Sequence, residues 1–196
     1  MLETTHLRRH FDELSEKMWT LIPIDPEISL KLRQNAEVRL KAQQFRPAEL
    51  AATKKVSTAI RNDQIFWLDA KSPTAADCEI EFLYTLQSIM NALREEMRVS
   101  LRYIECHYAF YQKGHYYQKH RDTTSVDNKR IFSFVLYLNE NWQIQDGGEL
   151  VGYDGAETIF TVRPYLGQLI IFRSEIEHEV KITARDRLSL TGWFRC

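Results

Sequence analysis

Two histidines and one aspartate are the residues of this sequence with the clearest chemical potential. His120 and Asp122 are two positions apart. Residues at that spacing point to the same side of an extended strand, so both side chains can reach one metal ion. His178, later in the chain, is the best candidate for a third ligand. Two imidazoles and one carboxylate on one face of an ion leave its other face open for reactants.

The alternative is that His120 and Asp122 form a polar strand end and that His178 lies in a surface loop, because such pairs also occur by chance. Neutral imidazole and carboxylate suit divalent iron, and this ligand set with open positions is that of non-haem Fe(II) oxygenases. The chain also has three widely spaced cysteines, Cys78, Cys106 and Cys196. They form no CxxC pair, which argues against a thiolate zinc site and a disulfide framework.

Arg187 adds a candidate anion-binding group. It opens a stretch in which residues 187, 189, 191 and 193 share one strand face. An arginine that points into a small barrel requires an anion, because a buried unpaired charge is too costly. Its planar guanidinium matches a carboxylate at two points. The alternative is a surface or structural ion-pair residue.

The composition suits one globular domain. The chain has 196 residues, and its net charge of -1 indicates no polyanionic partner such as nucleic acid. Apolar runs such as residues 169–172 are too short to cross a membrane. The charged N-terminal stretch differs from a signal peptide, so we expect a cytoplasmic protein without a membrane partner.

Helices are expected first along the chain. An amphipathic helix is predicted for residues 3–21 by apolar residues spaced three and four apart: Leu7, Phe11, Leu14, Met18 and Leu21. Asp25 and Pro26 resemble the cap and first turn of a second helix, which is expected to end near residue 44. A short helical turn over 47–52 is a further option.

The pattern changes at residue 60. Residues 60–68 are predicted to be extended, and residues 76–97 to form a long helix. Short β-branched or aromatic strands follow at 101–111, 131–138, 149–153, 158–162, 168–172, 178–182 and 188–195. Helices followed by strands predict an α+β fold, an antiparallel barrel or jelly roll buttressed by N-terminal helices. We expect a supporting helical segment over 1–59 and the main domain over 60–196, together forming one compact domain.

A set of motifs over residues 60–195 resembles one known family. In chain order they are Arg61-Asn-Asp63-Gln-Ile-Phe-Trp67, Tyr111-x-x-Gly114-x-x-Tyr117-x-x-His120-x-Asp122, Tyr137-Leu-Asn139-x-x-Trp142, Gly147-Gly-Glu-Leu150, His178-Glu-Val180 and Arg187-x-Ser-x-Thr-Gly-Trp-Phe194. Together they resemble the 2-oxoglutarate and Fe(II)-dependent dioxygenases of the prolyl 4-hydroxylase superfamily. The branch concerned is that of the hypoxia-factor prolyl hydroxylases and their bacterial relatives.

This resemblance implies a double-stranded β-helix, a jelly-roll or cupin-like barrel with iron at one mouth. It implies that the iron ligands, which also make up the catalytic centre, are His120, Asp122 and His178. By the same similarity Arg187 would bind the distal carboxylate of 2-oxoglutarate, and Tyr137 would donate its hydroxyl to it. Tyr111 would line that pocket. Thr191 is assigned to the pocket wall and Trp193 to the substrate side, with plain core packing as the alternative for both.

Substrate choice is expected at the rim of the barrel. The polar loop 123–130 follows the second ligand and is long enough to move over a bound peptide. We hypothesise that Asp63 and Arg130 form an ion pair at this rim and contribute to substrate binding; two independent solvated charges are the alternative. His107 and His115 are not expected to be ligands.

The resemblance implies hydroxylation of a peptidyl proline, with O2 consumed and succinate and CO2 released. Fe(II), 2-oxoglutarate and O2 are the implied cofactors and cosubstrates, with ascorbate as a candidate addition. The implied partner is a protein with an exposed proline, such as a transcription or translation component. Hydroxylation of a free amino acid or small metabolite is the alternative reaction. A non-catalytic binding module is a third reading, disfavoured because all ligands and Arg187 are present. The oligomeric state stays open.

Overall fold

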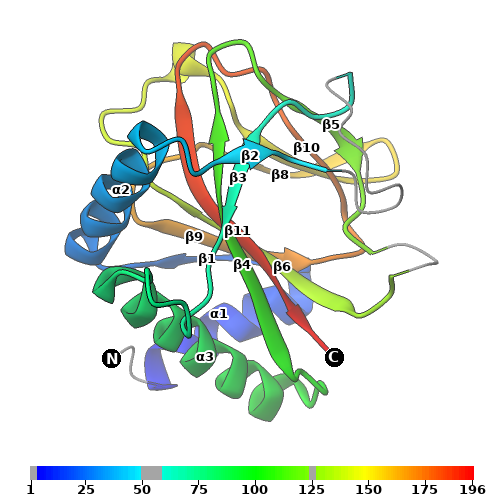
Figure 1. Cartoon of the computed structure of the whole chain (residues 1–196). Coiled ribbons are helices and arrows are strands. Elements are labelled where there is room, and N and C mark those ends of the chain that lie inside the picture. The colour runs from blue at the N-terminus through cyan, green and yellow to red at the C-terminus, as the bar shows by residue number, and fades with distance from the viewer. Residues whose placement is uncertain (1–3, 50–58, 124–126) are drawn as a thin grey trace.

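The computed structural model describes residues 4–49, 59–123 and 127–196 (Figure 1). Its α-helices are α1 (Thr4–Lys17), α2 (Pro26–Lys41) and α3 (Asp77–Met97). Figure 1 shows them gathered on one side of the strands. Within the described ranges, no helix is both long and apolar enough to span a membrane.

The strands form two antiparallel sheets. Seven strands are ordered β1-β9-β6-β11-β4-β3-β2 and four are ordered β5-β10-β7-β8. Their bounds are β1 (Trp19–Pro23), β2 (Arg46–Pro47), β3 (Gln64–Trp67), β4 (Tyr103–Tyr111), β5 (Tyr117–His120), β6 (Arg130–Tyr137), β7 (Leu150–Asp154), β8 (Glu157–Val162), β9 (Gln168–Arg173), β10 (Glu177–Val180) and β11 (Arg187–Arg195), with a short 3-10 helix at Ile144–Asp146.

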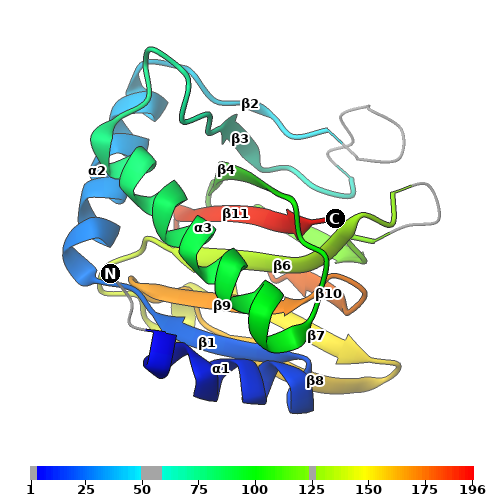
Figure 2. The ribbon, with the colours of Figure 1, turned by 90° about the horizontal axis from the view of Figure 1, so that it is seen from below.

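The larger sheet separates two apolar cores because successive side chains of a strand point to opposite faces. On its outer face Tyr108 and Phe134 pack in a core with Phe82 of α3, and Figure 2 shows α3 crossing these strands. On its inner face Val135 packs in a second core with Phe160 of the smaller sheet. The predicted α+β jelly roll is thus confirmed. In the part of the chain that the structure describes, it consists of two facing sheets rather than one closed barrel.

The N-terminal segment differs from the prediction. The first helix ends at Lys17, Met18 takes a positive φ of 67°, and β1 pairs with β9 at the edge of the larger sheet. The prediction of helix as far as residue 21 was therefore wrong. Leu21 fits the helical stripe, but sheet pairing with Ile170 overrides that local preference.

The second helix begins as predicted. The Asp25 carboxylate accepts a hydrogen bond from the Glu27 N–H at 2.8 Å, and Pro26 occupies the first helical turn. The helix ends at Lys41, earlier than expected. The predicted turn at 47–52 is wrong where it can be compared, because Pro47 is in β2; residues 50–52 of that prediction lie outside the described residues.

A buried ion pair joins α2 to α3, and we expect its loss to destabilise the fold. Arg39 Nε and Nη2 donate to the Glu79 carboxylate at 2.8 and 2.7 Å, and these residues are 6% and 2% exposed. Arg39→Ala would leave a buried carboxylate with its hydrogen bonds from Asn35 and the Ala76 N–H but without its cationic partner. We expect it to lower the free energy of unfolding by about 3–5 kcal/mol in urea titration.

The control replaces both charges. Arg39→Met combined with Glu79→Leu leaves no buried charge, so we expect this double variant to be more stable than Arg39→Ala. Equal stability of Arg39→Ala and the wild-type protein would contradict the prediction.

Candidate active site

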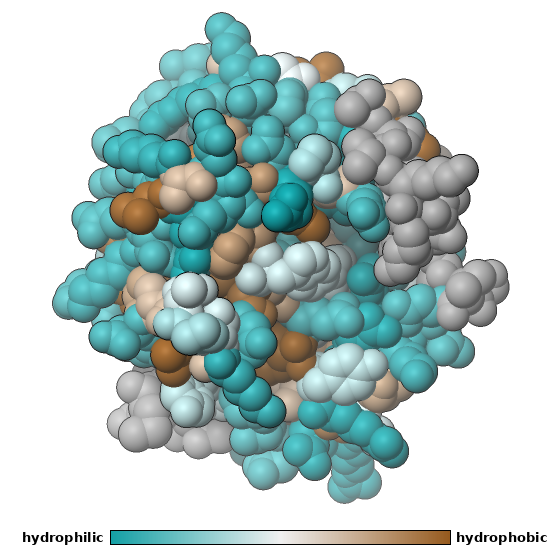
Figure 3. Space-filling model, viewed as in Figure 1, coloured by the Kyte–Doolittle hydropathy of each residue, from teal (hydrophilic) through white to brown (hydrophobic). Residues whose placement is uncertain are grey.

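A cavity of about 760 Å³ lies on the inner face of the larger sheet. Figure 3, which has the viewpoint of Figure 1, shows apolar and weakly polar side chains near the middle of the molecular surface that faces the viewer. Hydrophilic side chains surround them. Predicted site residues that line the cavity are Asp63, Tyr111, His120, Asp122, Arg130, His178, Arg187, Thr191 and Trp193. The fold therefore gathers residues from distant parts of the chain around one space.

His120, Asp122 and His178 form a cluster that could hold a metal ion. His120 ends β5 and is paired in register with His178 of β10, while Asp122 follows β5. The Nε2 atoms of His120 and His178 each lie 3.6 Å from an oxygen of Asp122. The three ligand atoms all lie within 4.8 Å of one another, and no other such group occurs among the described residues.

Backbone carbonyls orient both imidazoles. The Nδ1 atom of His120 lies 2.7 Å from the Gln118 carbonyl oxygen, and that of His178 lies 2.9 Å from the Ile176 carbonyl oxygen. A carbonyl only accepts, so each Nδ1 carries the proton, which leaves the Nε2 lone pair for a metal. Burial, aided by nearby His120, lowers the pKa of His178 to about 4. His178 is therefore neutral at pH 7, as a ligand must be.

Asp122 supplies the negative charge of the cluster. Burial alone raises the pKa of its carboxyl, but His178, His120 and the Ser133 hydroxyl outweigh this and hold the pKa well below its usual range. The group is therefore ionised at pH 7. A carboxylate with two imidazoles and no thiolate is a ligand set that fits Fe(II).

A stack of side chains supports His120. The rings of Tyr117 and His120 are stacked with centroids 3.6 Å apart, and the Arg61 guanidinium lies 4.4 Å from the Tyr117 centroid. Arg61 Nε and Nη2 donate to the buried Asp63 carboxylate at 2.7 and 2.5 Å. The predicted ion pair of Asp63 with Arg130 is therefore wrong, because Arg61 already occupies both carboxylate oxygens.

Arg130 lies elsewhere on the rim. Its guanidinium is 3.5 Å from the Trp193 ring centroid and faces Glu105 and Asp127 at 3.7 and 3.9 Å. Several acidic residues were available to Arg130 in the sequence, and charge alone could not select among them. Residues 124–126 of the predicted mobile loop lie outside the described residues.

Arg187 lines the cavity and, with Tyr137, forms a candidate anion site, although Tyr137 itself is not among the lining residues. Arg187 is 1% exposed, and its Nε and Nη1 donate to the Gly148 carbonyl and the Ser189 hydroxyl at 3.0 and 3.3 Å. Its guanidinium lies 5.0 and 5.2 Å from the ring centroids of Tyr111 and Tyr137. No carboxylate within the described ranges pairs with Arg187, and the buried Tyr137 hydroxyl has no hydrogen-bond partner. This arrangement fits one end of a bound dicarboxylate.

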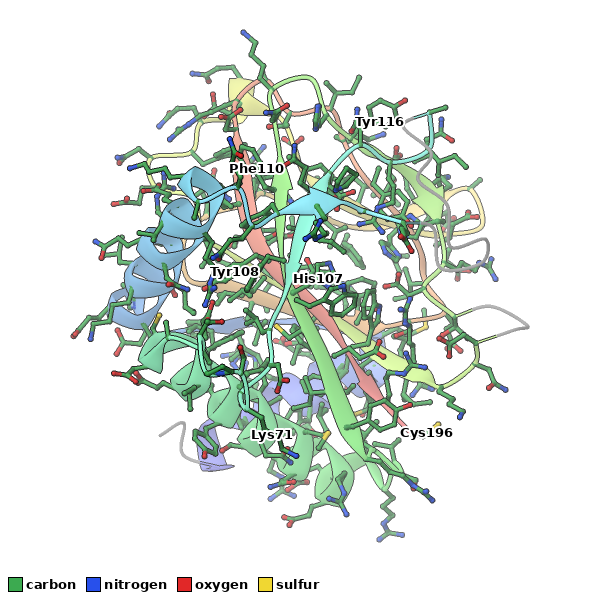
Figure 4. The ribbon with its side chains drawn as sticks, viewed as in Figure 1. Lys71, His107, Tyr108, Phe110, Tyr116 and Cys196 are labelled. Carbon is green, nitrogen blue, oxygen red and sulfur yellow. The ribbon has the colours of Figure 1, made fainter. Side chains whose placement is uncertain are left out.

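An aromatic wall lies on the open side of the cavity. The His107 ring centroid lies 4.6 Å from Trp67 and 5.6 Å from Trp193, and Thr191 pairs with His107 in register. Figure 4 shows His107 near the middle of this face. Burial lowers the pKa of His107 to about 3, and the positive charge of Arg61 contributes to this shift. The ring is therefore neutral.

Neither His107 nor His115 joins the metal cluster, as predicted. Sequence analysis missed the part that His107 plays in the wall and the support that Tyr117 gives His120. The sequence did contain a signal for the role of His107. His107 shares a strand face with Tyr111, and that face lines the cavity.

A jelly roll with a two-histidine, one-carboxylate cluster beside a buried arginine defines the class of non-haem iron oxygenases. The model of the 2OG-Fe(II) oxygenase superfamily matches residues 106–195. A solved prolyl-4-hydroxylase of Pseudomonas putida is 34% identical, with 97% of this chain and 99% of that chain covered and a TM-score of 0.88. The chain belongs to the 2OG-Fe(II) oxygenase superfamily.

Two further relatives are more distant. A prolyl hydroxylase from Trichoplax adhaerens, solved in complex with a peptide fragment of the hypoxia inducible factor oxygen degradation domain, has a TM-score of 0.88 at 23% identity, with 98% of this chain and 90% of that chain covered. Egl nine homolog 1 of Mus musculus is 26% identical over an alignment of 161 residues that covers 76% of this chain. The chain spans only 39% of the length of that curated relative.

Proposed function

We propose that this protein is a 2-oxoglutarate- and Fe(II)-dependent dioxygenase that hydroxylates a proline residue of a protein substrate. O2 is consumed, and succinate and CO2 are released. The observation that carries the proposal is the presence of the metal-binding cluster and the Arg187 anion site in one cavity. The near full-length similarity to the Pseudomonas putida prolyl-4-hydroxylase supports the reaction.

In this proposal His120, Asp122 and His178 hold Fe(II). The iron, with 2-oxoglutarate and O2, supplies the oxidising chemistry that inserts oxygen into a C–H bond. The chain keeps the His178 imidazole neutral, and the carbonyls of Gln118 and Ile176 direct the Nε2 atoms of both rings to the ion. The stacked Tyr117 ring limits rotation of His120.

Arg187 and Tyr137 bind the distal carboxylate of 2-oxoglutarate. The Gly148 carbonyl holds Arg187 Nε, so the rest of the guanidinium stays directed into the cavity. The Tyr137 hydroxyl donates the further hydrogen bond that it lacks within the protein. Tyr111 and Thr191 form walls of the same pocket.

The substrate proline enters along the aromatic wall in this proposal. Trp193 forms the side of the entrance, and Arg130 is stacked against it. Trp67 is half exposed and continues the wall to the surface. Asp63 contributes indirectly, because it holds Arg61 in place. The peptide complex of the Trichoplax adhaerens relative supports a peptide as the ligand.

Ascorbate is a candidate reductant, the cytoplasm the proposed location, and a transcription or translation component the proposed kind of substrate. Residues 1–59 and 60–196 are proposed to form one compact domain. This is supported by β1, which belongs to the larger sheet, and by an apolar core that contains both Leu7 and Phe194.

Tyr137→Phe separates cosubstrate binding from folding. We expect the affinity for 2-oxoglutarate to fall about tenfold or more, since a hydrogen bond to a charged group contributes about 1.5–3 kcal/mol. Stability should be unchanged or slightly higher, because the lost hydroxyl has no partner within the protein. Calorimetric titration with 2-oxoglutarate and urea unfolding measure the two effects.

Tyr153→Phe is the matched control, because the Tyr153 hydroxyl donates to Glu179 outside the cavity. It should retain normal affinity for 2-oxoglutarate. Unchanged affinity in Tyr137→Phe would exclude the proposed role of its hydroxyl.

The function is tested by incubating the purified protein with Fe(II), 2-oxoglutarate and a lysate, followed by mass spectrometry. The expected result is one added oxygen on a proline of a lysate protein, absent when His178→Ala is used. Succinate formation without any modified protein would contradict a protein substrate.

A further inference from the structure

We infer that Ser133 and Ser174 form a hydrogen-bond relay that fixes the Asp122 carboxylate, so that it offers one oxygen, Oδ1, to the metal ion. Both are positioning residues, and neither touches the ion. The inference rests on the proposed role of Asp122 as a metal ligand. Ser133 lies on β6 and Ser174 in the turn between β9 and β10, so only the fold brings them to Asp122.

The contacts among these residues are short and buried. Ser133 Oγ lies 2.6 Å from Asp122 Oδ2 and 2.9 Å from Ser174 Oγ. Both serines are 1% exposed. The Ser174 carbonyl also accepts the backbone N–H groups of Asp122 and Thr123, each at 3.2 Å. Ser174 therefore anchors the backbone of the ligand as well as the side-chain relay.

The direction of the relay follows from proton counting. An ionised carboxylate only accepts, so the single hydroxyl proton of Ser133 is donated to Asp122 Oδ2. The oxygen of Ser133 is then the acceptor in its contact with Ser174, and the Ser174 hydroxyl is the donor. A hydrogen bond to a charged acceptor is roughly twice as strong as a neutral one. The relay consequently favours one orientation of the carboxylate plane.

The histidines alone do not select an oxygen of Asp122. Oδ1 is 3.6 Å from His120 Nε2, and Oδ2 is 3.6 Å from His178 Nε2. The hydrogen bond from Ser133 withdraws electron density from Oδ2 and leaves Oδ1 as the stronger donor to a cation. Binding through a single oxygen also leaves free the coordination position that the second carboxylate oxygen would otherwise occupy. The reactants need this open position.

Loss of the Ser133 hydroxyl is expected to weaken metal binding without unfolding the protein. Ser133→Ala leaves Asp122 Oδ2 buried without its donor, so the carboxylate can rotate or bind through both oxygens. Changes to groups that orient metal ligands commonly cost about 10–100-fold in metal affinity. Ser174→Ala leaves the contact of Ser133 with Asp122 in place and should have a smaller effect.

The experiment titrates the purified full chain with Co(II), whose visible absorption spectrum reports its coordination. We expect Ser133→Ala to bind Co(II) about 10–100-fold more weakly, with an altered spectrum. Ser133→Thr keeps the hydroxyl and should restore both the affinity and the spectrum. Ser88→Ala is the control, since Ser88 is exposed on α3 and its hydroxyl donates only to the Tyr84 carbonyl.

The outcomes separate the relay from the metal site. Wild-type affinity and spectrum in a folded Ser133→Ala variant would overturn the relay while the metal site stands. A loss of thermal stability with an unchanged spectrum would reduce Ser133 to a structural role. If Ser133→Ala does not fold, Ser174→Ala is the test variant. Co(II) binding by Ser174→Ala that matches the wild-type protein would then overturn the relay. Absence of Co(II) binding by the wild-type protein would instead remove the proposed function.

Discussion

Replacement of Asp122 or His178 by alanine is expected to lower the conversion of 2-oxoglutarate to succinate by more than about a hundredfold. Loss of a residue that only orients a ligand costs about 10–100-fold, so loss of a ligand itself should cost more. The fold should survive because Asp122 follows β5 at the edge of the smaller sheet, and neither residue belongs to an apolar core.

Succinate assays measure this effect, and circular dichroism with thermal unfolding monitors the fold. His115→Ala is a matched control, because His115 lies outside the metal cluster and the cavity lining. It should retain near-normal turnover. Turnover close to wild type in Asp122→Ala would exclude its assignment as a ligand. Unfolding of both variants would contradict the placement of the ligands outside the packed core.

Arg187→Lys is expected to give the second large effect, a loss of about 2–5 kcal/mol in 2-oxoglutarate binding. This corresponds to roughly 30-fold or more, since each 1.4 kcal/mol is tenfold. Lysine keeps the positive charge but lacks the planar fork. It also cannot reproduce at once the anchor to the Gly148 carbonyl and the two-point contact with a carboxylate.

Calorimetric titration of the Mn(II)-loaded protein with 2-oxoglutarate measures this change. Ser189→Ala is the graded control, because it removes one 3.3 Å contact of Arg187 and leaves the guanidinium in place. Its effect should be clearly smaller. Wild-type affinity in Arg187→Lys would remove Arg187 from the cosubstrate pocket.

The metal-binding cluster shows which parts of the site can be predicted from local sequence spacing. The spacing of His120 and Asp122 was readable because the side-chain period of a strand is two residues. His178 was named from the sequence, but its register pairing with His120 is a tertiary contact. The carbonyls of Gln118 and Ile176 orient the two rings. They are backbone groups, which every residue has, so residue type does not identify them as partners.

The ion pairs show where local pattern fails. Asp63 was matched to the wrong arginine, although its true partner Arg61 is only two residues away. Charge identifies residues that need partners but not which of several candidates the fold brings near. The end of the first helix was misplaced for a related reason, because Leu21 satisfies a helical stripe and an edge strand alike.

The sequence by itself determined the α+β order of helices and strands, the residue types of an iron site and the arginine on the inner strand face. These follow from periodicity along one segment, which is a local property. Only the tertiary structure decided which groups meet: Arg61 with Asp63, His107 with Trp193, and the two serines with Asp122. The physical reason is that hydrogen bonds and ring contacts act over a few ångströms, and the folding of the whole chain sets those distances.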